Sequence, residues 1–191
     1  MADEPTLHLT DPRAMRALAH PTRLRLLGEL RVRGPQTVGM LTEVTGEAVG
    51  SVSYHLSKLA EHGFVREAPE LARDRRERWW RAAHARTSWE LVEALADPER
   101  KAASDLLRRA ILDRHVDRLR AYLDAEGTLD PAWVRGTTSS DSTLHLTSDE
   151  LVELRADLAA LSERWQARSD ANRAEARSVA LIVHAFRDAQ R

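Results

Sequence analysis

Two short amphipathic segments between residues 37 and 62, separated by one glycine, constrain the fold of this chain more than any other feature. Thr37 can cap a first helix that carries regularly spaced apolar residues, and Gly46 ends this helix. A second helix is predicted from about residue 48 to residue 62, and Gly63 supplies its C-terminal stop. Two helices joined by a tight glycine-containing turn are the elements of a helix-turn-helix unit.

The second of these helices has two chemically different faces. Val52, Leu56 and Leu59 lie together on one face at 100° per residue, which predicts that this face is buried. In a helix-turn-helix, the opposite face of the second helix, and chiefly its N-terminal half, reaches the edges of DNA bases. We therefore expect base contacts from Ser51, Ser53, Tyr54 and His55, and a phosphate contact from Lys58.

A β-hairpin is predicted directly after the second helix. Two β-prone runs, at residues 64–67 and 77–81, flank a polar tip. Trp79 and Trp80 are adjacent and cannot both face solvent in a strand, so we expect them to anchor the hairpin to the helices. Arginines on a protruding β-ribbon suit contact with phosphates or entry into a narrow minor groove. The arginines expected to make these contacts are Arg73, Arg75, Arg76 and Arg78.

Helices are also predicted on both sides of this unit. Asp11-Pro12 and His20-Pro21 each begin a helix before it, and Asp97-Pro98 begins a long helix after it. The long helix is apolar on two sides, so it needs two partners, which its own domain and a second subunit can supply. The alternative is a helix buried within one chain by the C-terminal region. One stripe consists of Ala103, Leu107 and Ala110, and the other of Leu112, Val116, Leu119 and Leu123.

The C-terminal part predicts a strand, a helix and a second strand. Residues 143–146 form the first strand, and Thr147 with Glu150 gives the capping-box pattern of a helix. The apolar run at residues 179–186 predicts a buried strand.

The expected fold is mainly α (α+β) and has two parts. Residues 11–87 form a winged helix-turn-helix domain, the hairpin being the wing. Residues 88–191 hold the long dimerisation helix and the small strand–helix–strand region.

Composition excludes several classes of protein. The 191 residues include no cysteine, which excludes disulfides, thiolate metal sites and a cysteine nucleophile. Residues 1–88 carry 14 Lys and Arg against 11 Asp and Glu, and the rest 15 against 19, which favours a polyanion-binding first half. With no phosphate loop or nucleophile elbow, neither enzymatic activity nor a cofactor is expected. The acidic N-terminus and the lack of a long apolar run predict a cytoplasmic, nucleoid-associated protein without membrane contact.

Several of these segments resemble ArsR-type winged helix-turn-helix regulators. The opening of that family resembles Leu18–Leu27, and its recognition helix and first wing strand resemble Val49–Leu59 followed by His62–Val65. Arg76–Arg81 resembles the wing of a subgroup with a C-terminal extension and no cysteine metal site, and the likeness covers about residues 12–85. The resemblance implies a homodimer that binds double-stranded DNA at a palindromic operator, usually as a repressor. It also implies dimerisation through the first helix and the long helix.

The resemblance leaves the regulatory signal open. Some members of the family hold metals with Asp and His on the long helix, where this sequence has Asp113 and His115 but Glu126 and Leu129 at the second pair. Two ligands out of four make a poor site, so no metal is expected. A small-molecule effector could bind the C-terminal region near Trp133, Trp165 or Phe186, although core packing of these aromatics is the simpler interpretation. A winged-helix module that binds protein, or a metal-responsive regulator using the long helix, remains the alternative.

Overall fold

The computed structural model describes residues 6–74 and 77–189 of the chain, so the predicted contacts Arg75 and Arg76 lie outside the described residues. The chain divides into two compact units, Met1–Tyr122 and Leu123–Arg191, which are described separately. The boundary predicted between residues 87 and 88 separates the expected DNA-binding part from the expected dimerisation part, and it stays a prediction.

The first unit begins with helices whose ends follow from the caps in the sequence. Asp11 accepts a hydrogen bond from the Arg13 amide at 2.9 Å, and Thr37 accepts one from Met40 at 3.2 Å. Gly46 has a φ of 72°, a left-handed conformation that glycine adopts without steric cost. These elements are α1 (Pro12–Leu18), α2 (Pro21–Arg33), α3 (Val38–Thr45) and α4 (Val49–Glu61).

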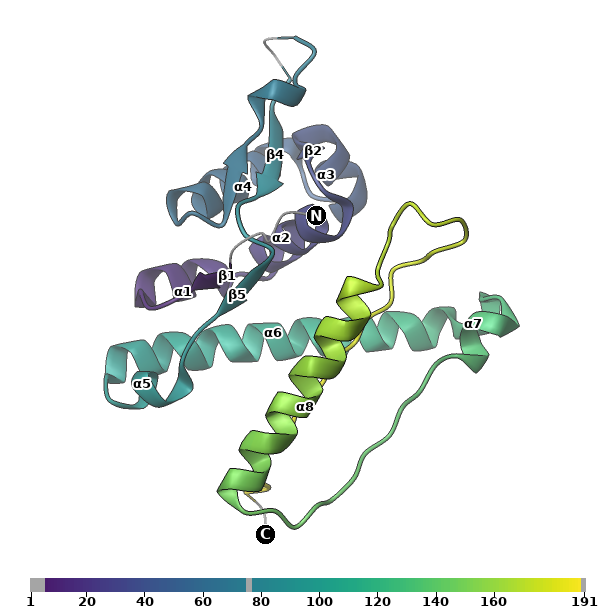
Figure 1. Cartoon of the computed structure of the whole chain (residues 1–191). Helices are drawn as coiled ribbons and strands as arrows, with labels where there is room; N and C mark the ends of the chain where they lie inside the picture. The colour runs from purple at the N-terminus through teal and green to yellow at the C-terminus, as the bar shows by residue number, and fades with distance from the viewer. Residues whose placement is uncertain (1–5, 75–76, 190–191) are drawn as a thin grey trace. The chain divides into compact units, whose positions relative to one another are not determined.

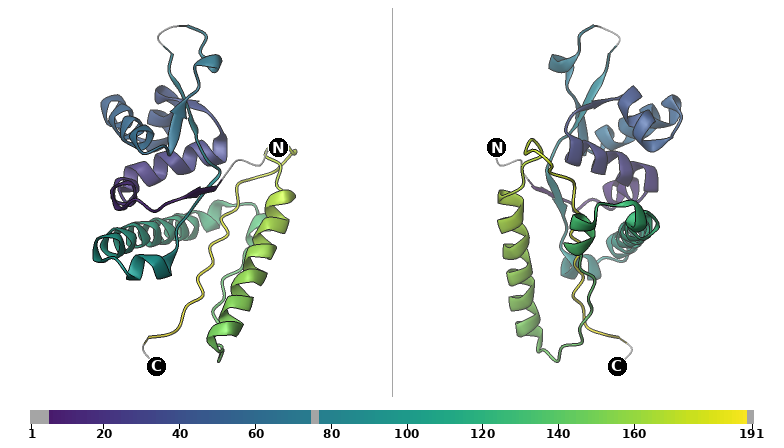
Figure 2. Two further views of the ribbon diagram at one scale, coloured as in Figure 1. Left: turned by 60° about the vertical axis from the view of Figure 1, so that its left-hand side comes forward. Right: turned by 90° about the vertical axis from the view of Figure 1, so that its right-hand side faces the viewer.

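The first unit also contains a three-stranded antiparallel sheet, whose strands lie side by side in the order β2-β4-β3. Its strands are β2 (Gln36–Thr37), β3 (Val65–Glu67) and β4 (Trp79–Ala82), with the 3-10 helix η1 (Pro69–Leu71) between the last two. In the β3–β4 hairpin Val65 pairs with Ala82 and Glu67 with Trp80. The hairpin projects beyond the helices as a wing (Figures 1 and 2), so the predicted winged helix-turn-helix fold is confirmed.

One hydrophobic core joins the helices to the sheet. Its buried side chains come from α1 to α4, from the long helix that follows the wing and from both hairpin strands, because each element turns its apolar face inward. Two further strands, β1 (Thr6–His8) and β5 (Arg86–Ser88), pair in parallel. Members of the core include Met15, Leu26, Leu41, Val52, Leu56, Leu59, Phe64, Trp80 and Leu107.

The long helix α6 (Pro98–Ala125) follows α5 (Leu91–Leu95) and has one buried and one exposed apolar stripe. Ala103 and Leu107 are buried in the core, and Ala110 packs against it. The second stripe has no partner within the described residues, where its exposed fractions run from 37% to 58%. It consists of Leu112, Val116, Leu119 and Leu123.

The second unit contains η2 (Glu126–Thr128), α7 (Pro131–Arg135) and α8 (Ser148–Ala167). Thr147 caps α8 in a complete capping box with Glu150, as the sequence predicts. The two strands predicted at residues 143–146 and 179–186 do not form. Most side chains of both segments are exposed, so neither segment supplies the buried strand that its apolar residues predict.

None of the helices in residues 6–74 and 77–189 combines the length and the apolar character needed to cross a membrane.

Candidate nucleic-acid interface

The turn between α3 and α4 is held by an arginine from α2. The guanidinium of Arg25 donates to the carbonyl oxygens of Thr45 and Val44, both at 2.8 Å. These are carbonyls of the last turn of α3, which have no partner inside the helix. Arg25 therefore fixes the direction in which the chain leaves α3 for α4.

Helix α4 begins without a side-chain cap. Ala48 occupies the N-cap and offers no acceptor, and Glu47 instead accepts a hydrogen bond from the hydroxyl of Ser51 at 3.1 Å. An alanine at this position costs about 1 kcal/mol of helix stability. The exposed residues at the start of α4 are Ala48, Val49 and Gly50, none of which carries a charge. The surface of a binding partner can therefore approach the backbone at the start of α4 closely.

The exposed face of α4 centres on Tyr54. Its ring is 54% exposed, and the neighbouring predicted contact Ser53 is half-buried. Ser57, which the sequence interpretation did not select, is exposed one turn after Ser53 and donates to the Ser53 carbonyl at 3.0 Å. Because Ser57 is three residues from Tyr54, a helical wheel centred on Tyr54 would have identified it.

The predicted phosphate contact Lys58 stands at the edge of this face. Its Nζ lies 2.9 Å from a carboxylate oxygen of Glu61 and 6.0 Å from the centre of the Tyr54 ring. The hydrogen bond and the charge of Glu61 raise the pKa of Lys58 above its ordinary value. The pair is solvent-exposed and so holds Lys58 only weakly.

His55 does not lie on the exposed face of α4 from which the sequence interpretation expected base contacts. Its side chain is 8% exposed, because α2 covers the side of α4 on which it lies. Its Nδ1 accepts a hydrogen bond from Nε of Arg23 at 3.3 Å, and its ring centre lies 4.5 Å from that of His20. His55 therefore joins α4 to the start of α2 and positions the helix.

The burial of His55 predicts a loss of stability in mild acid. Desolvation, followed by the positive charges of His20 and Arg23, lowers the pKa of His55, while Glu47 acts in the opposite direction. The unfolded chain, in which a histidine has a pKa of about 6.5, then binds the proton more readily than the folded chain, so stability falls as the pH falls below that value. Urea unfolding at pH 7.5 and 5.5 measures this loss, which should shrink in His55→Gln but not in the exposed control His145→Gln. An equal loss in wild type and His55→Gln would contradict it.

The wing is anchored to the core by one of its two tryptophans. Trp80 is 3% exposed, whereas Trp79 on the other side of the strand is half-buried. Both rings were expected to anchor the hairpin, but only Trp80 is buried in the core, because successive residues of a strand face opposite sides. The guanidinium of Arg78 lies 5.2 Å from the Trp80 ring centre, a distance typical of a cation–π contact.

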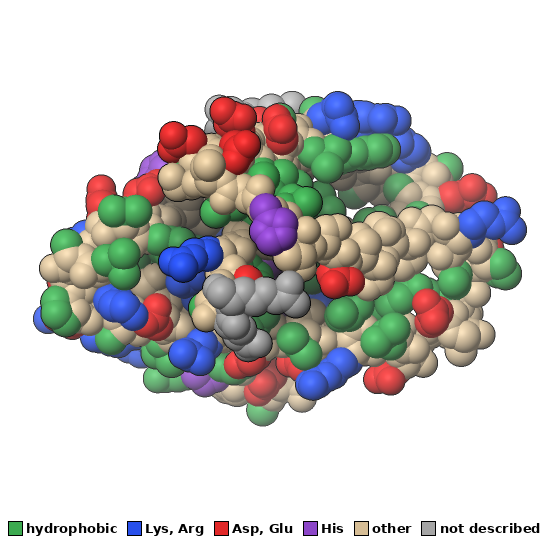
Figure 3. Space-filling model, turned by 90° about the horizontal axis from the view of Figure 1, so that it is seen from below, with side chains coloured by type: hydrophobic (Ala, Val, Ile, Leu, Met, Phe, Trp, Pro, Cys, Tyr) green, Lys and Arg blue, Asp and Glu red, His purple; other side chains and the backbone are tan. Residues whose placement is uncertain are grey.

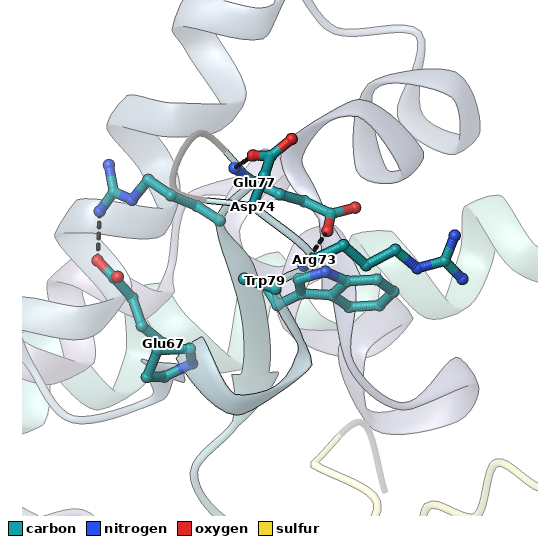
Figure 4. Close-up of a pocket in the computed structure, with 8 residues that line it drawn as sticks. Glu67, Arg73, Asp74, Glu77 and Trp79 are labelled. Carbon is teal, nitrogen blue, oxygen red and sulfur yellow. Dashed lines mark hydrogen bonds and ion pairs between the residues drawn. The ribbon is translucent and has the colours of Figure 1, made fainter.

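Carboxylates on the wing neutralise part of its arginine charge. Arg78 forms an ion pair with Glu67 across the hairpin, and Arg81 forms one with Glu70. The backbone amide of Arg73 donates a hydrogen bond to the Glu77 carboxylate at 2.9 Å, which lowers the pKa of that carboxyl. The guanidinium of Arg73 extends away from Glu77 (Figure 4). The sequence interpretation counted the arginines of the hairpin but not the acids that its register brings to them.

The other predicted ligand sites gain no support from the structure. Trp133, Trp165 and Phe186 are 43%, 53% and 76% exposed, so these aromatics do not pack in a core, which was the simpler interpretation of the sequence. Across residues 6–74 and 77–189, no three His, Asp or Glu side chains gather in a way that could hold a metal ion.

Residues 18–68 match a family described as a helix-turn-helix domain, from the end of α1 through β3. No curated protein matches the sequence. The similar solved structures include a homodimeric winged helix-turn-helix DNA-binding domain from Mycobacterium bovis, a possible ArsR-family regulator (22% identity over 58% of this chain and 80% of that one, TM-score 0.33). They also include a mutant MarR from E. coli (16% identity, 73% and 75% covered, TM-score 0.31) and a transcriptional regulator from Thermotoga maritima (15% identity, 78% and 80% covered, TM-score 0.32). At these TM-scores the likenesses carry no argument about function.

Proposed function

We propose that this chain is a sequence-specific DNA-binding transcriptional regulator of the ArsR-like winged helix-turn-helix type. It acts as a homodimer on a palindromic operator and represses transcription. The observation that carries the proposal is the combination of an exposed polar face on α4, centred on Tyr54, with a projecting wing that presents Arg73 and Arg78. A helix that enters the major groove and a ribbon that reaches the neighbouring backbone need this pair of surfaces.

The roles of the individual residues follow from their exposure. Tyr54, with Ser53 and Ser57, contacts base edges. Ser51 lies nearer the start of the helix, where its hydroxyl donates a hydrogen bond to Glu47. Lys58 binds a phosphate.

The ion pairs of Lys58 and Arg78 do not prevent contact with DNA. Both pairs are solvent-exposed, so water and salt screen them and they hold the two cations only weakly. A phosphate of the duplex can therefore replace the carboxylate at little cost, and binding also releases counterions from the DNA. The carboxylates that are left behind lower the affinity, which favours dissociation from DNA that offers no base contacts to Tyr54.

The exposed stripe of α6 supports the homodimer. Leu112 and Leu119 are 49% and 52% exposed on a helix whose other stripe is already buried in the core. A second copy covers this stripe with its own, since a two-fold axis brings the same surface of both subunits together. Two recognition helices related by that axis match a palindrome whose half-sites lie about one helical turn apart.

Substitution of Tyr54 by alanine tests the assignment of α4. Fluorescence anisotropy with the protein's own upstream DNA and with a scrambled duplex gives the ratio of the two affinities. We expect the free energy that corresponds to this ratio to fall by about 1–3 kcal/mol for each half-site, chiefly because operator binding weakens.

The matched control is Trp133→Ala, which removes an exposed aromatic ring from α7, outside the proposed DNA and dimer contacts. If Tyr54→Ala leaves the ratio unchanged while wild type prefers its own upstream DNA, α4 does not read the sequence. If wild type binds neither duplex, the domain is better explained as a protein-interaction module.

A further inference from the structure

The second unit exposes apolar side chains without forming a core. None of its described residues, 123–189, has a buried side chain. Figure 3 shows one face of the molecule, on which hydrophobic side chains are exposed between charged ones. Contiguous exposed apolar surface marks an interaction site, and a helix of this length draws most of its stability from packing against a partner. The exposed large side chains include Leu144, Leu146, Val152, Leu161, Trp165, Val179, Leu181, Val183 and Phe186.

Five apolar positions of α8 follow a heptad pattern, and we call these five positions the α8 seam. Its members are separated alternately by three and four residues, the spacing of the a and d positions that meet along two paired helices. The exposed fraction rises along the seam, from half-buried leucines to 37% for Leu161 and 53% for Trp165. The α8 seam consists of Leu151, Leu154, Leu158, Leu161 and Trp165.

The charges that flank the seam select a second, parallel copy of the same helix. In a parallel pair, the g position of one helix lies against the following e position of the other, which brings Glu150 to the partner's Arg155. In the antiparallel register that places Leu154 against the partner's Leu158, Arg155 and Asp157 each meet their own copies. That register also brings Glu150 to the partner's Arg164, but only the parallel arrangement brings opposite charges together without also pairing like charges, which are destabilising.

The seam borders a groove that remains open. This groove, of about 590 Å³, lies along α8, with Leu151 and Leu158 on one side and Leu181 and Val183 on the other. Its lining is mostly apolar, so it matches the leucine side chains of another helix rather than a charged ligand.

We infer that α8 pairs in parallel with α8 of a second copy through the α8 seam, forming a second contact within the homodimer. Two heptads are fewer than the three or four that mark an independent coiled coil. The pairing therefore rests on the proposed homodimer, which raises the effective concentration of one α8 for the other.

The absence of cysteine from the sequence allows a direct test with single cysteines in the full chain. In a parallel pair the d positions of the two helices face each other, so oxidised Leu154→Cys forms a disulfide between subunits. The matched control is Ala156→Cys, which is exposed on the opposite side of α8. We expect Leu154→Cys to give at least about tenfold more covalent dimer than Ala156→Cys on non-reducing gels without DNA.

Light scattering on the same samples distinguishes failure of the seam from failure of the homodimer. If the protein is a dimer but the two variants cross-link equally, the seam is wrong and the homodimer stands. If the protein is a monomer and neither variant cross-links, both proposals fall. If only a mixture of Leu154→Cys and Leu158→Cys cross-links, the helices are antiparallel and the parallel pairing is overturned.

Discussion

Replacing Leu119 by Asp should convert the protein from a dimer to a monomer and lower its affinity for the operator by about 10²–10⁴-fold. Leu119 is 52% exposed on the outer stripe of α6, so the substitution places a carboxylate in the proposed interface without entering the core. A charge buried there without a partner is strongly unfavourable. The loss of affinity follows because a monomer binds one half-site and forgoes the gain from linking two binding events.

The measurements are light scattering for mass, against a chain mass of 21.5 kDa, and anisotropy titration for binding. The matched control is Ala121→Asp, which adds the same charge to an exposed position on the opposite side of α6 and should leave both quantities unchanged. Circular dichroism confirms that each variant keeps its helices. A Leu119→Asp protein that stays dimeric and binds as wild type does would remove α6 from the interface.

The helix-turn-helix could be predicted from sequence because its signals are local. The cap at Thr37, the left-handed Gly46 and the spacing of Val52, Leu56 and Leu59 each act within a few residues, and the structure agrees with all of them. Such signals fix where a helix begins and ends and which of its faces is apolar.

The rotation of α4 could not be predicted to better than about one residue. The spacing of its apolar positions defines a buried face, but the edges of that face depend on which helix covers them. Because α2 lies against one edge, His55 is buried, and Ser57 is exposed on the other side. The contact between Arg23 and His55 joins residues 32 positions apart and has no signature in either segment.

Strands depend on partners that the local sequence does not name. Residues 179–186 have strong β propensity but form no strand, whereas β1, which was not predicted, pairs with β5 some 80 residues later. Propensity describes how a residue fits a sheet that already exists. For the same reason, the ion pair between Arg78 and Glu67 follows from the hairpin register and not from the arginine count.

The second large expected effect concerns the wing and the dependence of DNA affinity on salt concentration. Replacing Arg73 and Arg78 together by Ala should weaken binding to operator and scrambled DNA alike, by at least about tenfold at roughly 0.15 M salt. Each phosphate contact contributes roughly 0.9 to the slope of log affinity against log salt, so two arginines on each of two wings account for about 3 to 4 units. Anisotropy titrations from roughly 0.05 to roughly 0.3 M salt measure this change in slope.

Two further variants separate phosphate contact from a general effect of charge. Arg108→Ala with Arg109→Ala removes the same charge from the exposed surface of α6 and should change the slope little, because screening limits its reach to about 8 Å at physiological salt. Glu67→Gln releases Arg78 from its ion pair and should strengthen binding several-fold, the opposite direction to the loss of the arginine. If the wing only supported the fold, Glu67→Gln would leave DNA affinity unchanged, and the α6 and wing pairs would have equal slopes. The sign of the Glu67→Gln effect therefore decides whether the carboxylates of the wing compete with DNA for its arginines.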